Sequence, residues 1–274
     1  MTSGNRGDQL AGRVAFITGG GSGLGAAFSR RLAADGAHVI VNDIAPDAAG
    51  AIAAEIGGSA APFDVTDAVA FDEAVDKAVA QHGRLDILVN NAGIAPPPDP
   101  ARTEQAIANQ MLRMEGRVDE LVPPDITAGL SDTDWDRMIR IHLYGTFHGV
   151  RAALRHMTPA RSGSIVNVAS VLGLRPMAGA PHYAAAKAAI IALTKSVGQE
   201  VAPFGIRVNA VCPGWVDTPL LAPMDPMMMA GIMMQIPQGR MARAEELAEL
   251  VRFLAGPGAS YASGDVFTAS GGFV

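Results

Sequence analysis

The stretch Thr18-Gly19-Gly20-Gly21-Ser22-Gly23-Leu24-Gly25 decides how the first part of this chain folds. It follows the apolar run Val14–Ile17, which predicts a short buried strand, and it opens Leu24–Asp35, which has helical spacing. Glycines permit a tight turn and let an anion approach the backbone closely. The helix that follows would offer free N–H groups and the positive end of its dipole. A turn in this position predicts a dinucleotide-binding site.

Short apolar runs alternate with helical patterns along the rest of the chain. The further strand candidates are His38–Val41, Ala61–Phe63, Ile87–Val89, Ile165–Val168, Val208–Val211 and Val266–Thr268. Between them, Ala68–Gln81 and Tyr183–Val201 have helical spacing. Continuous apolar strands separated by helices predict a parallel sheet that is covered on both faces. Right-handed crossovers then give a doubly wound α/β (Rossmann) fold with about seven strands in one domain.

Composition narrows the class of protein. The chain has 274 residues, 49% of them hydrophobic, so a large core is expected. Its net charge of −6, with no basic block, argues against a nucleic-acid partner. No apolar run reaches the roughly 18 residues that a membrane span needs. The single cysteine, Cys212, fits a cytoplasmic location. We expect a flexible N-terminal tail over residues 1–10 and a single domain over residues 11–274.

A long connection over residues 94–131 interrupts the alternation of strands and helices. Apolar residues recur in it at helical spacing: Ile107, Met111, Met114, Val118 and Leu121. This spacing predicts one stripe of an amphipathic helix, which Pro123 and Pro124 would end. The sequence leaves open whether the helical insertion lines a substrate pocket or packs on a partner subunit.

Asp43 ends the second predicted strand, 18 residues after Gly25. A carboxylate there can accept hydrogen bonds from both adenosine ribose hydroxyls, and it would repel the 2′-phosphate of NADP. Ser22 stands where a basic side chain would otherwise meet that phosphate. Both features favour NAD, although Asp43 would also suit a cap for the next helix.

Tyr183 and Lys187 are spaced as i and i+4, so they share one face of a helix. A tyrosine has a pKa near 10, and a neighbouring ammonium group stabilises the phenolate and lowers that pKa. Ser170 follows the strand Ile165–Val168, which places its hydroxyl at the carboxyl end of the sheet, where ligands bind. These three residues are candidates for proton transfer and for holding a substrate oxygen.

In this order the motifs resemble those of the short-chain dehydrogenase/reductase family. The resemblance extends from about Leu10 to Val274. It is carried by Thr18-Gly19 with Gly23 and Gly25, Asp64-Val65, Asn90-Asn91-Ala92-Gly93, Ser170, Tyr183 with Lys187, Pro213-Gly214, and the closing Ser263-Gly264 and Ser270-Gly271-Gly272.

The resemblance implies a role for each catalytic candidate. Tyr183 would be the general acid in reduction and the base in oxidation. Lys187 would hold the nicotinamide ribose and keep the pKa of Tyr183 low, and Ser170 would bind the substrate oxygen. The expected reaction interconverts a secondary alcohol and a ketone with NAD.

The expected cofactor-binding residues follow the ends of the predicted strands. Asp64 and Val65 would flank the adenine, and Asn90 would meet the adenosine side. The full set is Gly19, Gly21, Ser22, Gly23, Leu24, Gly25, Asp43, Ile44, Asp64, Val65, Asn90, Asn91, Ala92, Gly93, Tyr183, Lys187, Pro213, Gly214, Val216 and Thr218.

His142 departs from the family pattern, which usually has an asparagine at this position that holds a water near Lys187. His142 could hold such a water or relay a proton itself near neutral pH, and it is counted with the catalytic candidates. It could also be a passive helix residue. We expect a structural or substrate-rim role for His182. The remaining histidines lack metal-ligand spacing, so no catalytic metal is expected.

Methionines are concentrated after Thr218: six of the 13 fall between Met224 and Met234. Methionine adapts to irregular apolar shapes. In the family this segment is often a mobile lid, here around residues 218–240, and a plain core or subunit-contact helix is the alternative. A lid of this composition implies an apolar substrate: an alicyclic or steroid-like ring system, a terpenoid or an acyl chain.

The sequence leaves two other functions open. One is reduction of 3-oxoacyl thioesters, for which Arg151, Arg155 and Arg161 could form a basic entrance, although Asp43 argues against the usual NADP. The other is a catalytically silent NAD-binding sensor or scaffold. By resemblance, the chain would form a homotetramer or homodimer through the helices Asp132–Met157 and Tyr183–Ala202.

Overall fold

The computed structural model describes residues 9–97, 99–221 and 225–274. Within these residues, seven strands form one fully parallel sheet in the order β3-β2-β1-β4-β5-β6-β7. The strands are β1 (Val14–Ile17), β2 (His38–Val41), β3 (Ser59–Ala60), β4 (Ile87–Asn90), β5 (Gly163–Val168), β6 (Ile206–Pro213) and β7 (Val266–Ala269). The predicted single-domain Rossmann fold is confirmed.

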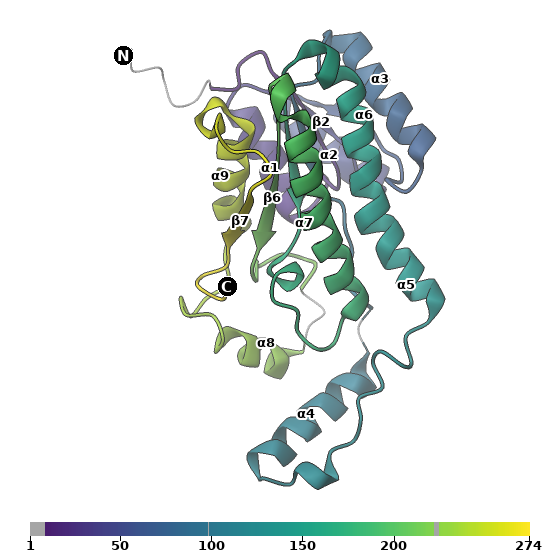
Figure 1. The fold of residues 1–274 in the computed structure, drawn as a ribbon, viewed down its shortest axis with the longest axis vertical. Coiled ribbons are helices and arrows are strands. Elements are labelled where there is room, and N and C mark those ends of the chain that lie inside the picture. The colour runs from purple at the N-terminus through teal and green to yellow at the C-terminus, as the bar shows by residue number, and fades with distance from the viewer. Residues whose placement is uncertain (1–8, 98, 222–224) are drawn as a thin grey trace.

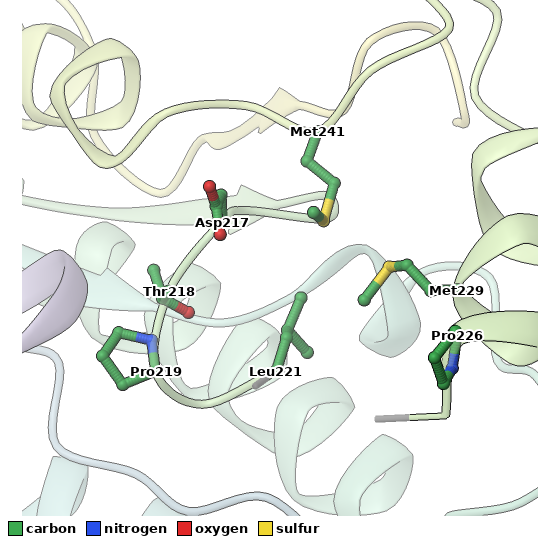
Figure 2. A pocket seen from close by; sticks show the side chains of 7 residues that line it. All are labelled: Asp217, Thr218, Pro219, Leu221, Pro226, Met229 and Met241. Atoms are coloured by element: carbon green, nitrogen blue, oxygen red, sulfur yellow. The ribbon is translucent and has the colours of Figure 1, made fainter. Parts of the chain in front are cut away.

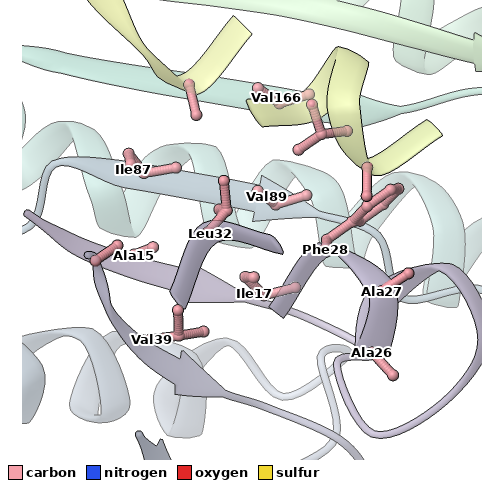
Figure 3. Packing of buried hydrophobic residues seen from close by; sticks show 14 of the residues in the cluster. Ala15, Ile17, Ala26, Ala27, Phe28, Leu32, Val39, Ile87, Val89 and Val166 are labelled. Carbon is pink, nitrogen blue, oxygen red and sulfur yellow. The ribbon is translucent and has the colours of Figure 1, made fainter. Parts of the chain in front are cut away.

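Helices cover both faces of the sheet (Figure 1). One face carries α1 (Gly23–Ala34), α2 (Pro46–Ile56) and α9 (Ala244–Ala255), and the other carries α3 (Ala68–His82), α6 (Gly145–Ala160) and α7 (Pro181–Val201). Successive residues of β1 show how the two cores divide. Ala15 and Ile17 pack with Phe28 and Leu32 of α1 (Figure 3), whereas Phe16 packs with Phe71 on the opposite face. This alternation is the physical reason that every position of the strand is apolar.

The third strand lies earlier than predicted, at Ser59–Ala60 instead of Ala61–Phe63. The amide of Asn42 donates hydrogen bonds to the carbonyl oxygens of Ala61 and Phe63, at 3.0 Å each. Pro62 between them has no N–H group to donate. One backbone bond, from Ala61 N to Val41 O at 2.9 Å, continues past β3, and beyond it the Asn42 side chain replaces the backbone pairing of a longer strand.

The insertion also differs from the prediction. Its helix, α4 (Pro100–Met114), begins after the cap residue Asp99 and ends before Gly116, whose φ of +75° breaks the helix. The predicted stripe therefore stops at Met114, and Val118 lies in a separate short turn, Val118–Glu120. Figure 1 shows α4 projecting away from the sheet and its covering helices. Met111 and Met114 are exposed.

Leu10, which the sequence analysis assigned to the tail, belongs to the core. Its side chain is buried, and its N–H donates to Asp35 O at 2.9 Å. The rest of the predicted tail, residues 1–8, lies outside the described residues. In the described part of the chain, no helix is both long and apolar enough to span a membrane.

Candidate active site

The carboxyl edge of the sheet gathers the candidate residues from distant parts of the sequence. The glycine-rich turn follows β1, Asp43 follows β2, Asn91 follows β4, Ser170 follows β5 and Gly214 follows β6. Strand order reverses between β1 and β4, because β2 lies on one side of β1 and β4 on the other. A crevice opens at such a point, and ligands of doubly wound sheets bind there.

The glycine-rich turn has the form of an anion cradle. Gly19 has a φ of +61°, and a Cβ at Gly25 would overlap the carbonyl oxygen of Gly19. Ser22 is the N-cap of α1 but makes no capping hydrogen bond with its side chain, and the first turn of α1 holds no acidic residue. The N-terminal end of α1 is thus left for an external anion, which fits the pyrophosphate of a dinucleotide.

Thr18 and Asn91 fasten this turn to the end of β4. Thr18 Oγ1 accepts hydrogen bonds from the backbone N–H of Asn91 at 2.9 Å and of Ala92 at 3.1 Å. The Asn91 amide donates to the carbonyl oxygens of Thr18 and Gly19, at 3.1 Å each. The side chain of Asn91 therefore shapes the turn itself.

Asp43 joins the end of β2 to the same turn. One carboxylate oxygen accepts from Gly21 N at 3.1 Å, and the other accepts from Ala45 N at 3.1 Å, beside the start of α2. Asp43 therefore contacts the expected cofactor-binding turn and also supports the start of the next helix, so its contacts agree with both roles considered for it. Ser22 and Ile44 are exposed beside it.

Two of the expected adenosine contacts have side chains committed to the fold. Asn90 is buried, and its amide donates to Asn167 Oδ1 at 2.9 Å and to Thr146 O at 3.4 Å. Val65 is buried against Gly145 of α6. The side chain of Asn90 therefore ties β4 to β5 and α6, which differs from the expected cofactor contact. Asp64 is exposed and accepts from Thr66 N.

Ser170, Tyr183 and Lys187 come together at the ends of β5 and α7. Tyr183 lies in the first turn of α7 and is hydrogen-bonded to the Ser170 side chain. Lys187 is buried, with its Nζ 5.6 Å from the centre of the Tyr183 ring. The same ammonium donates to Val168 O at 2.8 Å, which fixes it against the end of β5. The predicted triad is one cluster in space.

Burial controls the electrostatics of this cluster. It raises the pKa of Tyr183 above its ordinary value, although the hydrogen bond with Ser170 opposes the shift. It also lowers the pKa of Lys187 from 10.5 to about 7. The direction for Tyr183 is opposite to the one expected from an adjacent ammonium, because loss of hydration is the largest influence on this phenol.

Cys212 is a neighbour of this cluster that the sequence did not reveal. Its thiol is fully buried, and burial raises its pKa to about 11, while a hydrogen bond from the Ser170 backbone and the charge of Lys187 oppose the shift. The thiol is therefore protonated at neutral pH and acts as a small apolar residue behind the site.

His142 lies beside Tyr183, at a ring-centroid distance of 5.3 Å and with the two rings nearly perpendicular. It sits in the π-helical turn Arg140–Tyr144, which links α5 (Asp132–Ile139) to α6. Burial, followed by the charge of Lys187, holds the pKa of His142 well below its ordinary 6.5. His142 is therefore neutral near pH 7, which removes the expected role as a titrating relay at that pH.

The ring nitrogens of His142 have contrasting surroundings. When Nε2 carries the proton, it can donate to Ile94 O, which lies 2.9 Å away. When Nδ1 carries the proton, Nε2 accepts a hydrogen bond from Ile94 N at 3.1 Å. Nδ1 is buried and has no hydrogen-bond partner among the described residues. Gly93 is essential to this packing, because a Cβ there would lie 3.0 Å from Nδ1 and closer still to Cε1. His182 is buried nearby, which fits the structural role expected for it.

The segment after β6 closes the other side of the crevice. A Cβ at Gly23 would lie 3.7 Å from Thr218 Cβ, so this segment meets the glycine-rich turn. Gly214 lets Ser270 of the C-terminal segment approach closely. Pro213 and Val216 are buried and support these neighbours.

A pocket of about 670 Å³ lies beside Thr218 (Figure 2). It is lined by Asp217, Thr218, Pro219, Leu221, Pro226, Met229 and Met241. Figure 2 shows the thioethers of Met229 and Met241 and the side chain of Leu221 facing the same space. The predicted methionine-rich segment forms α8 (Pro226–Met233) over this space, while residues 222–224 of the predicted lid lie outside the described residues.

Comparison with known proteins fits this geometry. The short chain dehydrogenase family model matches residues 13–228. The chain is 41% identical over 271 residues to cis-4-hydroxycyclohexanecarboxylate dehydrogenase of Sinomonas cyclohexanicum, covering 97% of this chain and 98% of the relative. It is 36% identical to the 3-oxoacyl-[acyl-carrier-protein] reductase of Thermotoga maritima, with 97% and 99% covered. It is 34% identical to 2,5-dichloro-2,5-cyclohexadiene-1,4-diol dehydrogenase of Sphingobium indicum, with 97% and 98% covered.

The chain belongs to the short chain dehydrogenase family. It is an oxidoreductase that acts on CH–OH groups and binds a nicotinamide dinucleotide. Among the described residues, no group of three or more His, Cys, Asp or Glu side chains lies close enough together to hold a metal ion.

The burial of Lys187 predicts a pH-dependent stability. Between its folded-state pKa of about 7 and its ordinary value of 10.5, the unfolded chain binds a proton that the folded chain lacks. The wild-type protein therefore gains stability as the pH rises through this window. Lys187→Met removes the buried charge, so its stabilising effect should be largest below pH 7 and smaller toward about pH 9.5.

Urea unfolding of both proteins at about pH 6 and about pH 9.5 measures this difference. Lys195→Met is the matched control, because Lys195 is exposed on the same helix. A difference between Lys187→Met and wild type that does not change with pH would contradict the assignment.

Proposed function

We propose that the protein is an NAD-dependent dehydrogenase that interconverts an alicyclic secondary alcohol and its ketone, with Tyr183 as the general acid and base. The observation that carries the proposal is the cluster of Ser170, Tyr183 and Lys187 beside the dinucleotide-binding turn. Two relatives whose names specify cyclohexane or cyclohexadiene alcohols support the substrate class.

Proton transfer in this proposal runs through the Tyr183 hydroxyl. In the oxidation direction, the phenolate accepts the proton of the substrate hydroxyl, and in reduction the phenol returns it. The Ser170 hydroxyl donates a hydrogen bond to the substrate oxygen and stabilises charge that develops there. When bound, a nicotinamide dinucleotide supplies the ring that exchanges the hydride with the substrate carbon.

Lys187 supports the phenolate by charge and position. Its ammonium faces the Tyr183 ring from 5.6 Å and is anchored on Val168 O at 2.8 Å. Because its pKa is about 7, Lys187 also exchanges protons readily near neutral pH. It is therefore suited to pass the proton taken by Tyr183 towards solvent.

We place His142 next on this proton path. Its Nε2 meets both an acceptor and a donor of the same residue, Ile94. Either neutral tautomer thus keeps one hydrogen bond, so little energy separates the two. A neutral histidine with two accessible tautomers can take a proton on one nitrogen and release one from the other without becoming charged.

The choice of cofactor, the assembly and the location in the cell are each supported by one feature. The carboxylate of Asp43 beside Gly21 favours NAD over NADP, because it would repel a 2′-phosphate. Trp135 of α5, Tyr144 of the π-helical turn and Phe147 of α6 are exposed, which suits assembly into a homotetramer or homodimer through these helices and α7. The single cysteine suits a cytoplasmic location.

Reduction of 3-oxoacyl thioesters is the second candidate, favoured by the similarity to a 3-oxoacyl-carrier reductase. The arginines suggested as its basic entrance are engaged elsewhere. Arg151 and Arg155 pair with Asp72 and Asp76 of α3, and Arg161 donates to Pro203 O. These contacts reduce the charge available to an acidic carrier.

The test of the proposed function is NAD(H)-dependent turnover of alicyclic alcohols and ketones. Wild type should turn over several such compounds, and Tyr183→Phe should lower kcat by about 10²–10⁴-fold, because it removes only the proton donor. NADH binding by fluorescence shows that the variant is folded. Binding without turnover across the panel would favour the silent-sensor alternative, and activity restricted to 3-oxoacyl thioesters would favour the second candidate.

Asp43→Asn tests the cofactor preference. The amide keeps an acceptor for Gly21 N–H but removes the charge that repels a 2′-phosphate. The ratio of kcat/KM with NAD to kcat/KM with NADP should fall by about tenfold. An unaltered ratio would show that Asp43 serves only the turn and α2.

His142→Ala tests the proton path. It should lower kcat and alter the pH profile of kcat, with little effect on KM, because the missing group moves protons and does not bind substrate. His142→Asn should recover part of the rate, since an amide can hold a water at this position. Identical pH profiles for wild type and His142→Ala would return His142 to a packing role.

A further inference from the structure

Arg175 lies on the loop that joins two parts of the site, five residues after Ser170 and eight before Tyr183. The start of this loop, Val171–Gly173, packs tightly on α7, and a Cβ at Gly173 would lie 2.8 Å from the backbone of Lys187. The loop therefore starts at Ser170, packs on the backbone of Lys187 and leads into the helix that carries Tyr183, so Arg175 stands between two parts of the catalytic cluster.

The guanidinium of Arg175 is held in place by the C-terminal segment. Its Cζ lies over the Phe273 ring, 4.7 Å from the ring centre, and its Nη1 donates to Phe273 O at 2.9 Å. Phe273 itself is buried. A stacked and hydrogen-bonded arginine has lost much of its freedom, so a ligand that binds it has little further ordering to impose.

The C-terminal segment also touches the other walls of the site. Ser270 packs on Gly214, and Gln238 N, after α8, donates to Gly271 O at 3.1 Å. Figure 1 shows the C-terminus near α8, at the carboxyl edge of the sheet. Arg175 is thus braced by a segment shared with both the crevice and the end of the methionine-rich region.

The charge of Arg175 is not balanced by an ion pair. Arg102 and Arg117 of the insertion and Arg240 after α8, by comparison, pair with the carboxylates of nearby residues. Within the described ranges, no carboxylate pairs with Arg175, and its guanidinium donors other than Nη1 have no hydrogen-bond partner. An exposed, oriented guanidinium fork with free donors matches a carboxylate.

We propose that Arg175 binds a carboxylate group of the substrate, so that the substrates are alicyclic hydroxy acids and oxo acids. This inference rests on the proposed function and deepens it. The apolar ring would lie against the methionine-lined wall, while the carboxylate pairs with Arg175. The arginine is a specificity-determining residue that acts on substrate binding and takes no part in proton transfer.

The test compares 4-oxocyclohexanecarboxylate with its neutral methyl ester. Wild type should prefer the acid, mainly through KM. Arg175→Met should lower the acid-to-ester ratio of kcat/KM by about 10- to 100-fold, the range expected for a hydrogen-bonded charge pair. Arg175→Lys, which keeps the charge but lacks the fork, should lower it less. Added salt should lower the wild-type ratio and leave that of Arg175→Met nearly constant.

Arg161→Met is the matched control. Arg161 also donates to a backbone carbonyl, Pro203 O, and lies over a phenylalanine ring, Phe204, but it stands just before the amino end of β5. Its replacement should leave the acid-to-ester ratio at the wild-type value. Equal ratios for wild type and Arg175→Met would overturn the proposal, as would a ratio that falls equally in Arg161→Met.

Binding of unreactive cyclohexanecarboxylate, measured by calorimetry in the presence of NADH, separates this inference from the proposed function. Turnover of the ester with an unaltered ratio in Arg175→Met refutes the carboxylate site alone. No turnover of either compound by wild type refutes the proposed function. In that case, loss of cyclohexanecarboxylate binding in Arg175→Met still supports the site, and unchanged binding overturns it.

Discussion

The hydrogen bonds between Thr18 and Asn91 are the constraint on which the cofactor side of the site depends. They join the ends of β1 and β4, where the order of the sheet reverses and the crevice opens. They extend the pairing of β1 with β4 beyond the strand ends and into the glycine-rich turn, where glycines by themselves restrict backbone conformation little. With them, the end of α1 and the carboxylate of Asp43 face one ligand position.

The chemistry of the substrate side depends on how much water is excluded. Burial raises the pKa of Tyr183 and lowers that of Lys187 to about 7, so the two pKa values move apart: the phenol holds its proton more tightly and the ammonium releases its proton more easily. A phenolate at Tyr183 therefore depends on the groups that stabilise it in the site, such as the Ser170 hydroxyl. The protonated thiol of Cys212 and the neutral ring of His142 add no net charge to this balance.

Sequence predicted those parts of the fold that depend on local hydrophobic pattern. The parallel strands read as apolar runs because both faces are covered, and the triad was evident because strand ends converge on one edge. Contacts between side chain and backbone could not be read in this way. The Asn42 amide binds the backbone where a longer β3 was predicted, and Gly116 ends α4 before the predicted helical stripe does. The Asn90 amide donates to Asn167 within the core, where a cofactor contact was expected.

Positions whose role depends on a distant partner were also hidden. Gly93 matters because the His142 ring lies against it, and Arg175 is oriented by Phe273 from the other end of the chain. Neither relation leaves a periodic signal in the sequence. By contrast, the departure at His142 was visible because a motif provided an expected residue for that position.

The projecting helix α4 has a consequence for how such a protein can diversify. It stands apart from the sheet and its covering helices, between β4 and α5, and none of the cofactor or triad candidates lies on it. The entropy of closing a connection grows only slowly with its length. This segment can therefore be lengthened, shortened or exchanged while the reacting groups keep their positions, which leaves evolution free to vary it under separate selection.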